Sequence, residues 1–114
     1  MFQVEKRDGA VAEFQLSKIS DAIGKAFEAE QKNYSRDMLD MLALRVTADF
    51  QEKIREDRIQ VEKIQDSVEN VLIQCGYGDV AKAYILYRKQ REKMRNMKST
   101  ILDYKEIVDS YVKV

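Results

Sequence analysis

Residues 3–23 read QVEKRDGAVAEFQLSKISDAI, and the hydrophobic pattern changes once within this stretch. Apolar and polar residues alternate over residues 2–6, and a weaker alternation follows from Val11 to Phe14. Asp8-Gly9 lies between the two runs and is a strong hairpin signal, because both residues tolerate the positive φ of a tight turn. The stretch therefore predicts a β-hairpin at the N-terminus. Since a two-stranded hairpin is marginal alone, other elements must cover one of its faces.

From Leu16 onward, apolar residues recur at the spacing of a helix. Ser17 and Asp79 stand where N-caps are expected, and Gly76 is a usual residue for a helix stop. The second helix is expected to begin after Ser35. The four expected helices each carry an apolar stripe and cover residues 16–27, 36–50, 61–75 and 80 to about 95. The predicted fold is mainly α, a four-helix cluster capped by the N-terminal β-hairpin.

The residues after this cluster differ from the rest of the chain. An apolar stripe follows the most basic part of the sequence and consists of Ile101, Tyr104, Ile107, Val108, Tyr111 and Val112. We expect one domain over residues 1–95 and a linker or helical tail over residues 96–114. The tail is either a fifth helix docked on its own domain or a segment that leads into a further part of a longer protein.

The composition of the 114 residues restricts the possible chemistry. The chain has no His and one Cys, so the commonest general base, a disulfide within the chain and a multi-Cys zinc site are all excluded. A lone thiol at Cys75, no signal peptide and no membrane span indicate a soluble protein of the reducing cytoplasm. No catalytic residue and no metal ligand set is predicted.

The zero net charge conceals an uneven distribution. Residues 1–87 carry 12 basic and 16 acidic side chains, whereas residues 88–98 carry six basic and one acidic. Positive charge is therefore concentrated after Tyr87, so the neutral total does not argue against an anionic ligand.

Cationic side chains also stand beside the expected hairpin turn and at the first helix start. Lys6 and Arg7 precede the turn, and Lys18 lies in the first helical turn, where the helix dipole disfavours a positive charge. If Lys6 and Lys18 converge on free backbone N–H groups of that helix, they form a phosphate site without a glycine-rich loop. The alternative is a surface lysine paired with a carboxylate such as Glu13.

Two longer motifs add a family resemblance. The first is VEKRDG at residues 4–9, followed by Phe14, Lys18-Ile19 and Ala22-Ile23. The second is IQVEKIQDSVE at residues 59–69, followed by Gly76-Tyr77 and by VAKAYILYR at residues 80–88. Together they closely resemble the ATP-cone, a regulatory nucleotide-binding domain, over residues 3 to about 91. The tail, STILDYKEIVDSY at residues 99–111, resembles the segment that leads into the catalytic domain of anaerobic, class III ribonucleoside-triphosphate reductases.

The resemblance implies a hairpin lid over four helices, with ATP or dATP between them. It implies that ATP permits and dATP inhibits the activity of a reductase whose catalytic domain lies outside this chain. Mg²⁺ is expected with the nucleotide, and the expected partners are the catalytic domain and other cones, not a membrane or nucleic acid.

The resemblance also assigns roles to particular residues. Lys6, Arg7 and Lys18 are expected to hold phosphates. Val4 and Val61 are expected to line the base pocket. Three further members complete the expected nucleotide-binding set beside Glu13: Gln65 at the polar edge of that pocket, and Tyr87 and Arg91, which would close the site from the fourth helix.

Two other functions remain open at this level. The first is the ATP-cone of a transcriptional repressor of reductase genes, although a four-cysteine zinc ribbon precedes the cone in those proteins and only Cys75 is present here. The second is a helical nucleic-acid-binding module in which residues 88–98 contact a phosphate backbone.

Overall fold

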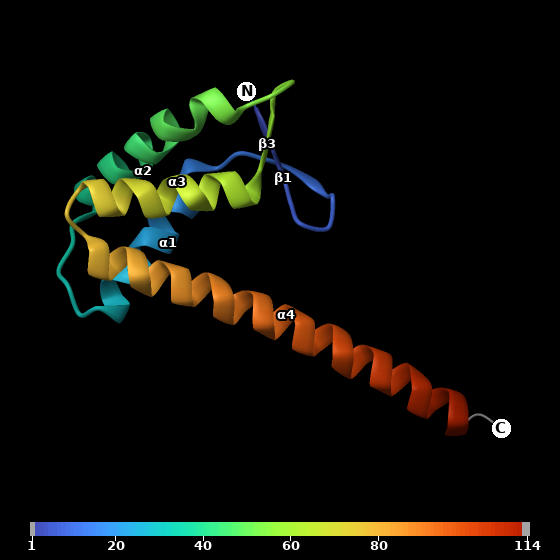
Figure 1. Cartoon of the computed structure of the whole chain (residues 1–114). Coiled ribbons are helices and arrows are strands. Elements are labelled where there is room, and N and C mark those ends of the chain that lie inside the picture. The colour runs from blue at the N-terminus through green and yellow to red at the C-terminus, as the bar shows by residue number, and fades with distance from the viewer. Residues whose placement is uncertain (1, 113–114) are drawn as a thin grey trace.

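The computed structural model describes the backbone of residues 2–112 and the side chains of residues 2–94 and 97 (Figure 1). Over the described residues, the structure has four α-helices, one short 3₁₀ helix and three short strands, which confirms the mainly α prediction. In chain order the elements are β1 (Gln3–Glu5), β2 (Val11–Glu13), α1 (Leu16–Ala29), α2 (Arg36–Phe50), η1 (Gln51–Lys53), β3 (Arg58–Gln60), α3 (Val61–Gln74) and α4 (Gly78–Val112).

The predicted hairpin is present, but it belongs to a three-stranded sheet with the order β2-β1-β3. β1 pairs antiparallel with β2, with Val4 opposite Ala12. β3 was not predicted, and it pairs parallel with β1, with Ile59 opposite Val4. The sheet therefore joins the hairpin to the start of α3, which follows β3 directly.

Asp8 and Gly9 stabilise the turn between β1 and β2 in different ways. Gly9 has a φ of 87°, a value that glycine adopts without a steric cost. Asp8 has no positive φ; its Oδ1 accepts a hydrogen bond from the N–H of Ala10 at 2.9 Å. The N–H of Lys6 donates to the carbonyl of Ala10 at 2.7 Å and closes the loop.

Three phenylalanines hold the base of the hairpin against the helices. The Phe2 and Phe14 ring centroids lie 4.6 Å apart, and both rings meet Phe50 of α2 edge-on, at 5.6 and 5.7 Å. Edge-to-face contacts at these distances add to the stabilisation from burial alone. The base of the hairpin is thus fixed, while its tip projects from the body (Figure 1).

The helix stripes predicted from the sequence form the core. The expected apolar residues of α1 to α4 that are buried are Ile19, Ile23, Ala26, Phe27, Leu39, Leu42, Val46, Phe50, Ile64, Val68, Val71, Leu72, Val80, Ala83 and Tyr84. Cys75 ends the third expected helix, and the apolar stripe of that helix predicts a core position for it. In the structure Cys75 is only half-buried and packs against the edge of the core.

Both predicted N-caps are wrong, whereas the expected start of the second helix after Ser35 is confirmed. Ser35 is the N-cap of α2, and its side chain accepts a hydrogen bond from the N–H of Met38 at 3.2 Å. Ser17 lies inside α1, whose N-cap position is Gln15. Asp79 lies in the first turn of α4, because Gly76, with a φ of 86°, ends α3 and the next helix begins at Gly78.

α4 also continues past Arg95, where the fourth helix was expected to end. It is one helix of 35 residues that ends at Val112, so the separate fifth helix is wrong. The sequence has no Pro, and its last Gly is Gly78, so no residue with a strong preference against helix interrupts α4. The side chains of the tail stripe lie outside the described residues.

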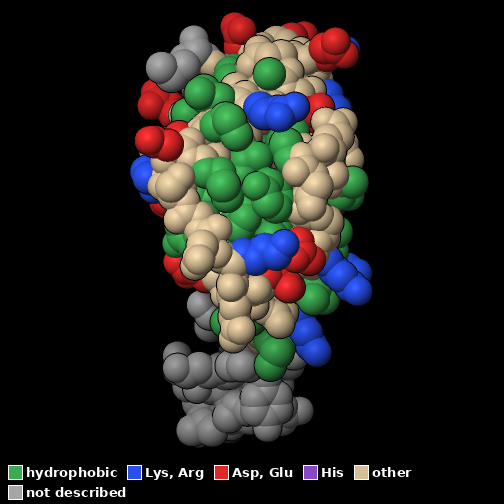
Figure 2. Space-filling model, turned by 90° about the vertical axis from the view of Figure 1, so that its left-hand side faces the viewer, with side chains coloured by type: hydrophobic (Ala, Val, Ile, Leu, Met, Phe, Trp, Pro, Cys, Tyr) green, Lys and Arg blue, Asp and Glu red, His purple; other side chains and the backbone are tan. Residues whose placement is uncertain are grey.

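Figure 2 shows the face that carries the α1–α2 and α3–α4 connections. Hydrophobic side chains gather in its middle, with cationic side chains above and below them. Exposed large hydrophobic residues on α2 and α3 include Met41, Leu44 and Ile73. Among the residues that the structure describes, no helix combines the length and the apolar character needed to cross a membrane.

Candidate functional site

A cavity of about 270 Å³ lies between the hairpin, the start of α1, α3 and α4. Its walls are mainly apolar, and charged side chains reach it from the hairpin and α1. The lining residues are Val4, Lys6, Ala12, Glu13, Phe14, Gln15, Lys18, Ile19, Ala22, Val61, Ile64, Gln65, Val68 and Tyr84. An apolar pocket with a few polar groups is the usual form of a small-molecule site.

The cavity brings together six of the nine residues singled out in the sequence. These six are Val4, Lys6, Glu13, Lys18, Val61 and Gln65. The sequence did not single out Phe14, Ile64 or Val68 as site residues, although Ile64 and Val68 share a helix face with Val61 and Gln65. Helical spacing could have identified Ile64 and Val68 as site residues, but the same spacing also predicts that they belong to the core.

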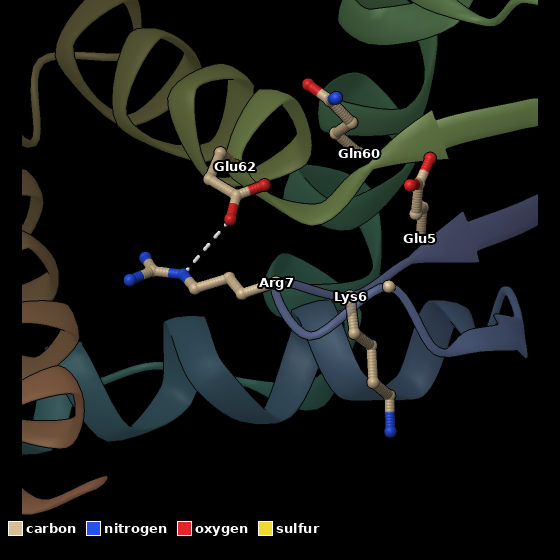
Figure 3. A pocket seen from close by; sticks show the side chains of 6 residues that line it. Glu5, Lys6, Arg7, Gln60 and Glu62 are labelled. Atoms are coloured by element: carbon tan, nitrogen blue, oxygen red, sulfur yellow. Dashed lines mark ion pairs between the residues drawn. The ribbon is translucent and has the colours of Figure 1, made fainter. Parts of the chain in front are cut away.

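The alternation of β1 explains why Val4 and Lys6 share the cavity. Side chains two apart in a strand point to the same face of a sheet. Figure 3 shows Lys6 directed toward α1, whereas Glu5 and Gln60 point away from it on the other side. The hairpin thus supplies one apolar wall and one cation to the same space.

The N-terminus of α1 opens onto this cavity without the groups that usually satisfy a helix start. Gln15 makes no side-chain capping hydrogen bond, and the first turn holds no acidic residue. Lys18 lies in that turn and lines the cavity. Free N–H groups beside a lysine favour an anion. No ion pair joins Lys18 to Glu13, although both are described, so the expected alternative of a Lys18–Glu13 pair is not observed.

Arg7 is held beside the cavity rather than inside it. It lines an adjacent hollow of about 330 Å³ that shares Lys6 with the cavity (Figure 3). The Arg7 Nε lies 3.1 Å from Glu62 of α3, and its Nη1 lies 3.3 Å from Glu92 of α4. Its Nη2 donates to the Oε1 of Gln65 at 3.4 Å. One guanidinium therefore connects the hairpin loop to both helices.

The structure does not bring Tyr87 and Arg91 to this cavity. Tyr87 lines a different hollow, between α1 and α4, that Lys25 also lines. The Arg91 Nη1 donates to the Tyr87 hydroxyl at 3.1 Å. The residue of α4 that does line the cavity is Tyr84, three positions before Tyr87. The sequence left two roles open for Tyr84, a core position or a contact with the nucleotide.

Tyr84 is the buried polar group of the cavity wall. Burial is the main cause that raises its pKa to about 12, and the nearby Arg88 charge opposes this shift. The phenol is therefore neutral at physiological pH.

Metal ligation by protein groups alone is not supported in the described part of the chain, where no cluster of three His, Cys, Asp or Glu side chains is present. Glu13 is the single carboxylate among the residues that line the cavity. Mg²⁺ commonly takes one or two carboxylates together with phosphate oxygens and water, so Glu13 fits a metal carried by a nucleotide.

Comparisons with known proteins place the chain in a family. The family model described as the ATP cone domain matches residues 2–93. Over 96 residues the chain is 43% identical to the ribonucleoside-diphosphate reductase subunit alpha of Chlamydia pneumoniae, covering 79% of this chain and 9% of that protein.

Two other reductases are similar over nearly the same region. A vitamin B12-dependent ribonucleoside-diphosphate reductase of Thermoplasma acidophilum is 41% identical over 101 residues, which cover 84% of this chain and 13% of that protein. An anaerobic ribonucleoside-triphosphate reductase of Haemophilus influenzae is 35% identical over 103 residues, 88% of this chain and 14% of that protein. The match therefore spans 9–14% of the length of these relatives, and the chain belongs to the ATP-cone family.

Proposed function

We propose that this chain is the adenine-nucleotide-sensing regulatory domain of an anaerobic ribonucleoside-triphosphate reductase, with ATP as activator and dATP as inhibitor. The observation that carries the proposal is the apolar cavity with Lys6, Lys18 and the uncapped start of α1 at its polar side. An apolar wall suits an adenine ring, and cations with free N–H groups suit its phosphates.

The cavity supports a division of roles among its residues. Val4 and Val61 would contact the base, and Gln65 would give that pocket a polar edge. Lys6 and Lys18 would hold phosphates, joined by Arg7 if it leaves its carboxylate partners. Mg²⁺ would be bound mainly by the phosphates, with Glu13 as its protein ligand.

The anaerobic class is assigned from the tail, because residues 99–111 resemble the segment before the catalytic domain of those enzymes. The match to the H. influenzae enzyme, named as an anaerobic reductase, supports this assignment. The T. acidophilum and C. pneumoniae relatives carry other names, so similarity over the cone does not by itself distinguish the classes. We also propose a boundary near residue 95, contacts between cones and a cytoplasmic location, which fits the unpaired Cys75.

Regulation would operate by differential binding. A ligand shifts an equilibrium between two states only by the difference in its affinity for them. ATP and dATP differ by one 2′-hydroxyl, whose hydrogen bond supplies about 1–2 kcal/mol if one state alone makes it. That difference is roughly a tenfold bias, within the usual range of allosteric coupling.

Calorimetric titration tests the proposal with ATP, dATP and a short DNA duplex. We expect micromolar binding of both nucleotides. Lys6→Ala and Lys18→Ala should each weaken it by about 1.5–3 kcal/mol, the range for a hydrogen bond to a charged group. Lys82→Ala, an exposed lysine of α4 outside the cavity, is the matched control.

Unchanged nucleotide affinity in both cavity variants would remove the proposed phosphate site. Salt-sensitive binding of the duplex without binding of nucleotides would instead support the nucleic-acid-binding alternative.

A further inference from the structure

A second surface of the molecule combines apolar and cationic groups away from the nucleotide cavity. It begins in a groove of about 280 Å³ between the C-terminal half of α1 and α4. Small and apolar side chains form most of the groove. Its lining residues are Lys25, Ala26, Ala29, Glu30, Ala83, Leu86, Tyr87 and Gln90.

Apolar residues continue from this groove along α4. Leu86, Met94 and Met97 are 55%, 60% and 55% exposed, which is high for large hydrophobic side chains on one helix. With Gln90 they are spaced by three or four residues, so they lie on one face of α4. Figure 1 shows that α4 extends away from the other elements beyond this point.

The sequence carries the same spacing further. From Gln90 the steps alternate strictly between four and three residues, through Met94, Met97, Ile101, Tyr104, Val108 and Tyr111. A sustained seven-residue repeat on one helix is typical of packing against a second helix along its length. The repeat begins where the structure shows the exposed methionines.

Cationic groups flank the apolar residues that the structure describes. Lys89, Arg91 and Lys93 are exposed on α4, and Lys25 of α1 lines the groove. Within the described residues, none of these four forms an ion pair. Lys25 and Arg91 both lie over the Tyr87 ring, at 5.9 and 5.7 Å from its centroid.

The same positive charges affect the pKa of Tyr87. Burial would raise it, but the hydrogen bond from Arg91 and the charges of Arg91 and Lys25 outweigh burial and lower the pKa. The groove is therefore positive around Tyr87, although the carboxylate Glu30 also lines it.

We propose that the α1–α4 groove and the exposed stripe Leu86, Gln90, Met94 and Met97, together the α4 seam, bind an amphipathic helix of a partner protein with acidic residues beside its apolar stripe. Charge complementarity decides this occupant. If a second copy of the chain paired in parallel through this stripe, the cationic flanks of the two α4 helices, with Arg91 and Lys93, would lie close together. Like charges at such flanking positions oppose pairing.

A pair of synthetic helices tests the α4 seam directly. Both peptides carry leucine at the apolar positions of about four heptads. One peptide has glutamate at the flanking positions and the other has lysine. We expect the labelled glutamate peptide to bind at micromolar concentration by fluorescence anisotropy, at least tenfold more tightly than the lysine peptide.

Variants locate the binding on the protein. Met94→Glu combined with Met97→Glu should weaken the glutamate peptide at least tenfold, and Lys93→Glu should reduce its advantage over the lysine peptide. Met41→Glu is the matched control, because Met41 is similarly exposed but lies on α2. Circular dichroism checks that each variant keeps its helical content.

Several outcomes would overturn the proposal. They are equal affinity for the two peptides, no effect of the Met94 and Met97 changes, or tighter binding to phosphatidylserine vesicles or a DNA duplex than to the glutamate peptide. Dimers in sedimentation that the Met94 and Met97 changes abolish would identify a second copy as the occupant instead. Nucleotide titration is independent of all these outcomes, so a failure here leaves the proposed function unaffected.

Discussion

At the scale of single residues, two buried serines differ in how their hydroxyls are satisfied. The Ser20 hydroxyl donates to the Oδ1 of Asp40 at 3.2 Å and joins α1 to α2. Among the described residues, the fully buried Ser67 Oγ has no hydrogen-bond partner. An unsatisfied buried hydroxyl costs free energy that its removal recovers.

We therefore expect Ser67→Ala to raise the free energy of unfolding by about 1 kcal/mol, since alanine also has the higher helix propensity. Ser20→Ala should lower it by a similar amount, because it leaves the Asp40 carboxylate without this donor. Urea unfolding measures both changes. The same sign for the two variants would contradict the assignment.

The buried Tyr84 should make the free energy of unfolding decrease at alkaline pH. Its folded-state pKa is about 12, above the ordinary value of 10, because burial disfavours the phenolate. Stability is therefore fully present below pH 10 and is lost as the pH rises from 10 toward 12. The loss approaches about 1.4 kcal/mol per pH unit within that window.

Urea unfolding at pH 9 and pH 11 tests this dependence. The decrease between the two values should be smaller in Tyr84→Phe, which has no phenol to ionise. An equal decrease in the variant and the parent chain would show that other groups, such as lysines, cause it.

At the scale of elements, the turn before β3 is the place where a substitution is most clearly expected to raise the stability. Arg55 and Arg58 exchange two backbone hydrogen bonds of 2.9 Å, and Glu56 and Asp57 between them have φ values of 53° and 59°. Two central residues with positive φ define a type I′ turn, which favours Asn-Gly. Non-glycine residues are strained in this region.

Glu56→Asn combined with Asp57→Gly should raise the free energy of unfolding by about 1 kcal/mol, because the new residues adopt this turn with less strain. Thermal unfolding measures the change. The matched control is Glu56→Ala with Asp57→Ala, which removes the same two charges but does not favour positive φ. An equal gain from the control pair would show that charge, and not backbone strain, is the cause.

The same turn explains why the sequence did not predict β3. Asp8-Gly9 predicted the hairpin, because its glycine is a local signal for positive φ. Glu56-Asp57 contains no glycine, and Arg58–Gln60 is too short to show a convincing alternation. β3 is stabilised by its parallel partner β1, which lies more than fifty residues earlier in the chain, and a window of local sequence does not contain that partner.

At the scale of the whole molecule, Arg7 connects the hairpin, beside the cavity proposed for the nucleotide, to α3 and α4. Its guanidinium is shared between Glu62, Glu92 and Gln65, so a bound phosphate would compete with two carboxylates for it. Moving Arg7 to a ligand would release Glu92 of α4, the helix that extends from the body (Figure 1). This contact offers a path from nucleotide binding to the tail.

We expect Glu92→Gln to increase the affinity for ATP by roughly two- to fivefold, because an exposed ion pair contributes at most about 1 kcal/mol. Calorimetric titration measures the change. Glu52→Gln, which alters an exposed carboxylate of η1 that does not line the cavity, should leave the affinity unchanged. Unaltered or weaker binding by Glu92→Gln would exclude competition for Arg7.

The sequence by itself determined the features whose causes are local. Turn chemistry specified the hairpin, the helical period specified four buried stripes, and motif order indicated the ATP-cone family. Two pairs of the expected site residues follow from local causes, since strand alternation unites Val4 with Lys6 and the helix period unites Val61 with Gln65. The two pairs share one cavity because of the tertiary structure.

Only the tertiary structure decided which side of α4 faces the cavity. Tyr84 and Tyr87 are three residues apart and share a helix face broadly, so their spacing alone could not separate them. Packing turns α4 so that Tyr84 lines the cavity, while Tyr87 and Arg91 lie on the side toward the α1–α4 groove. The rotation of a helix about its axis is set by all its neighbours together, and no local pattern in its sequence contains that information.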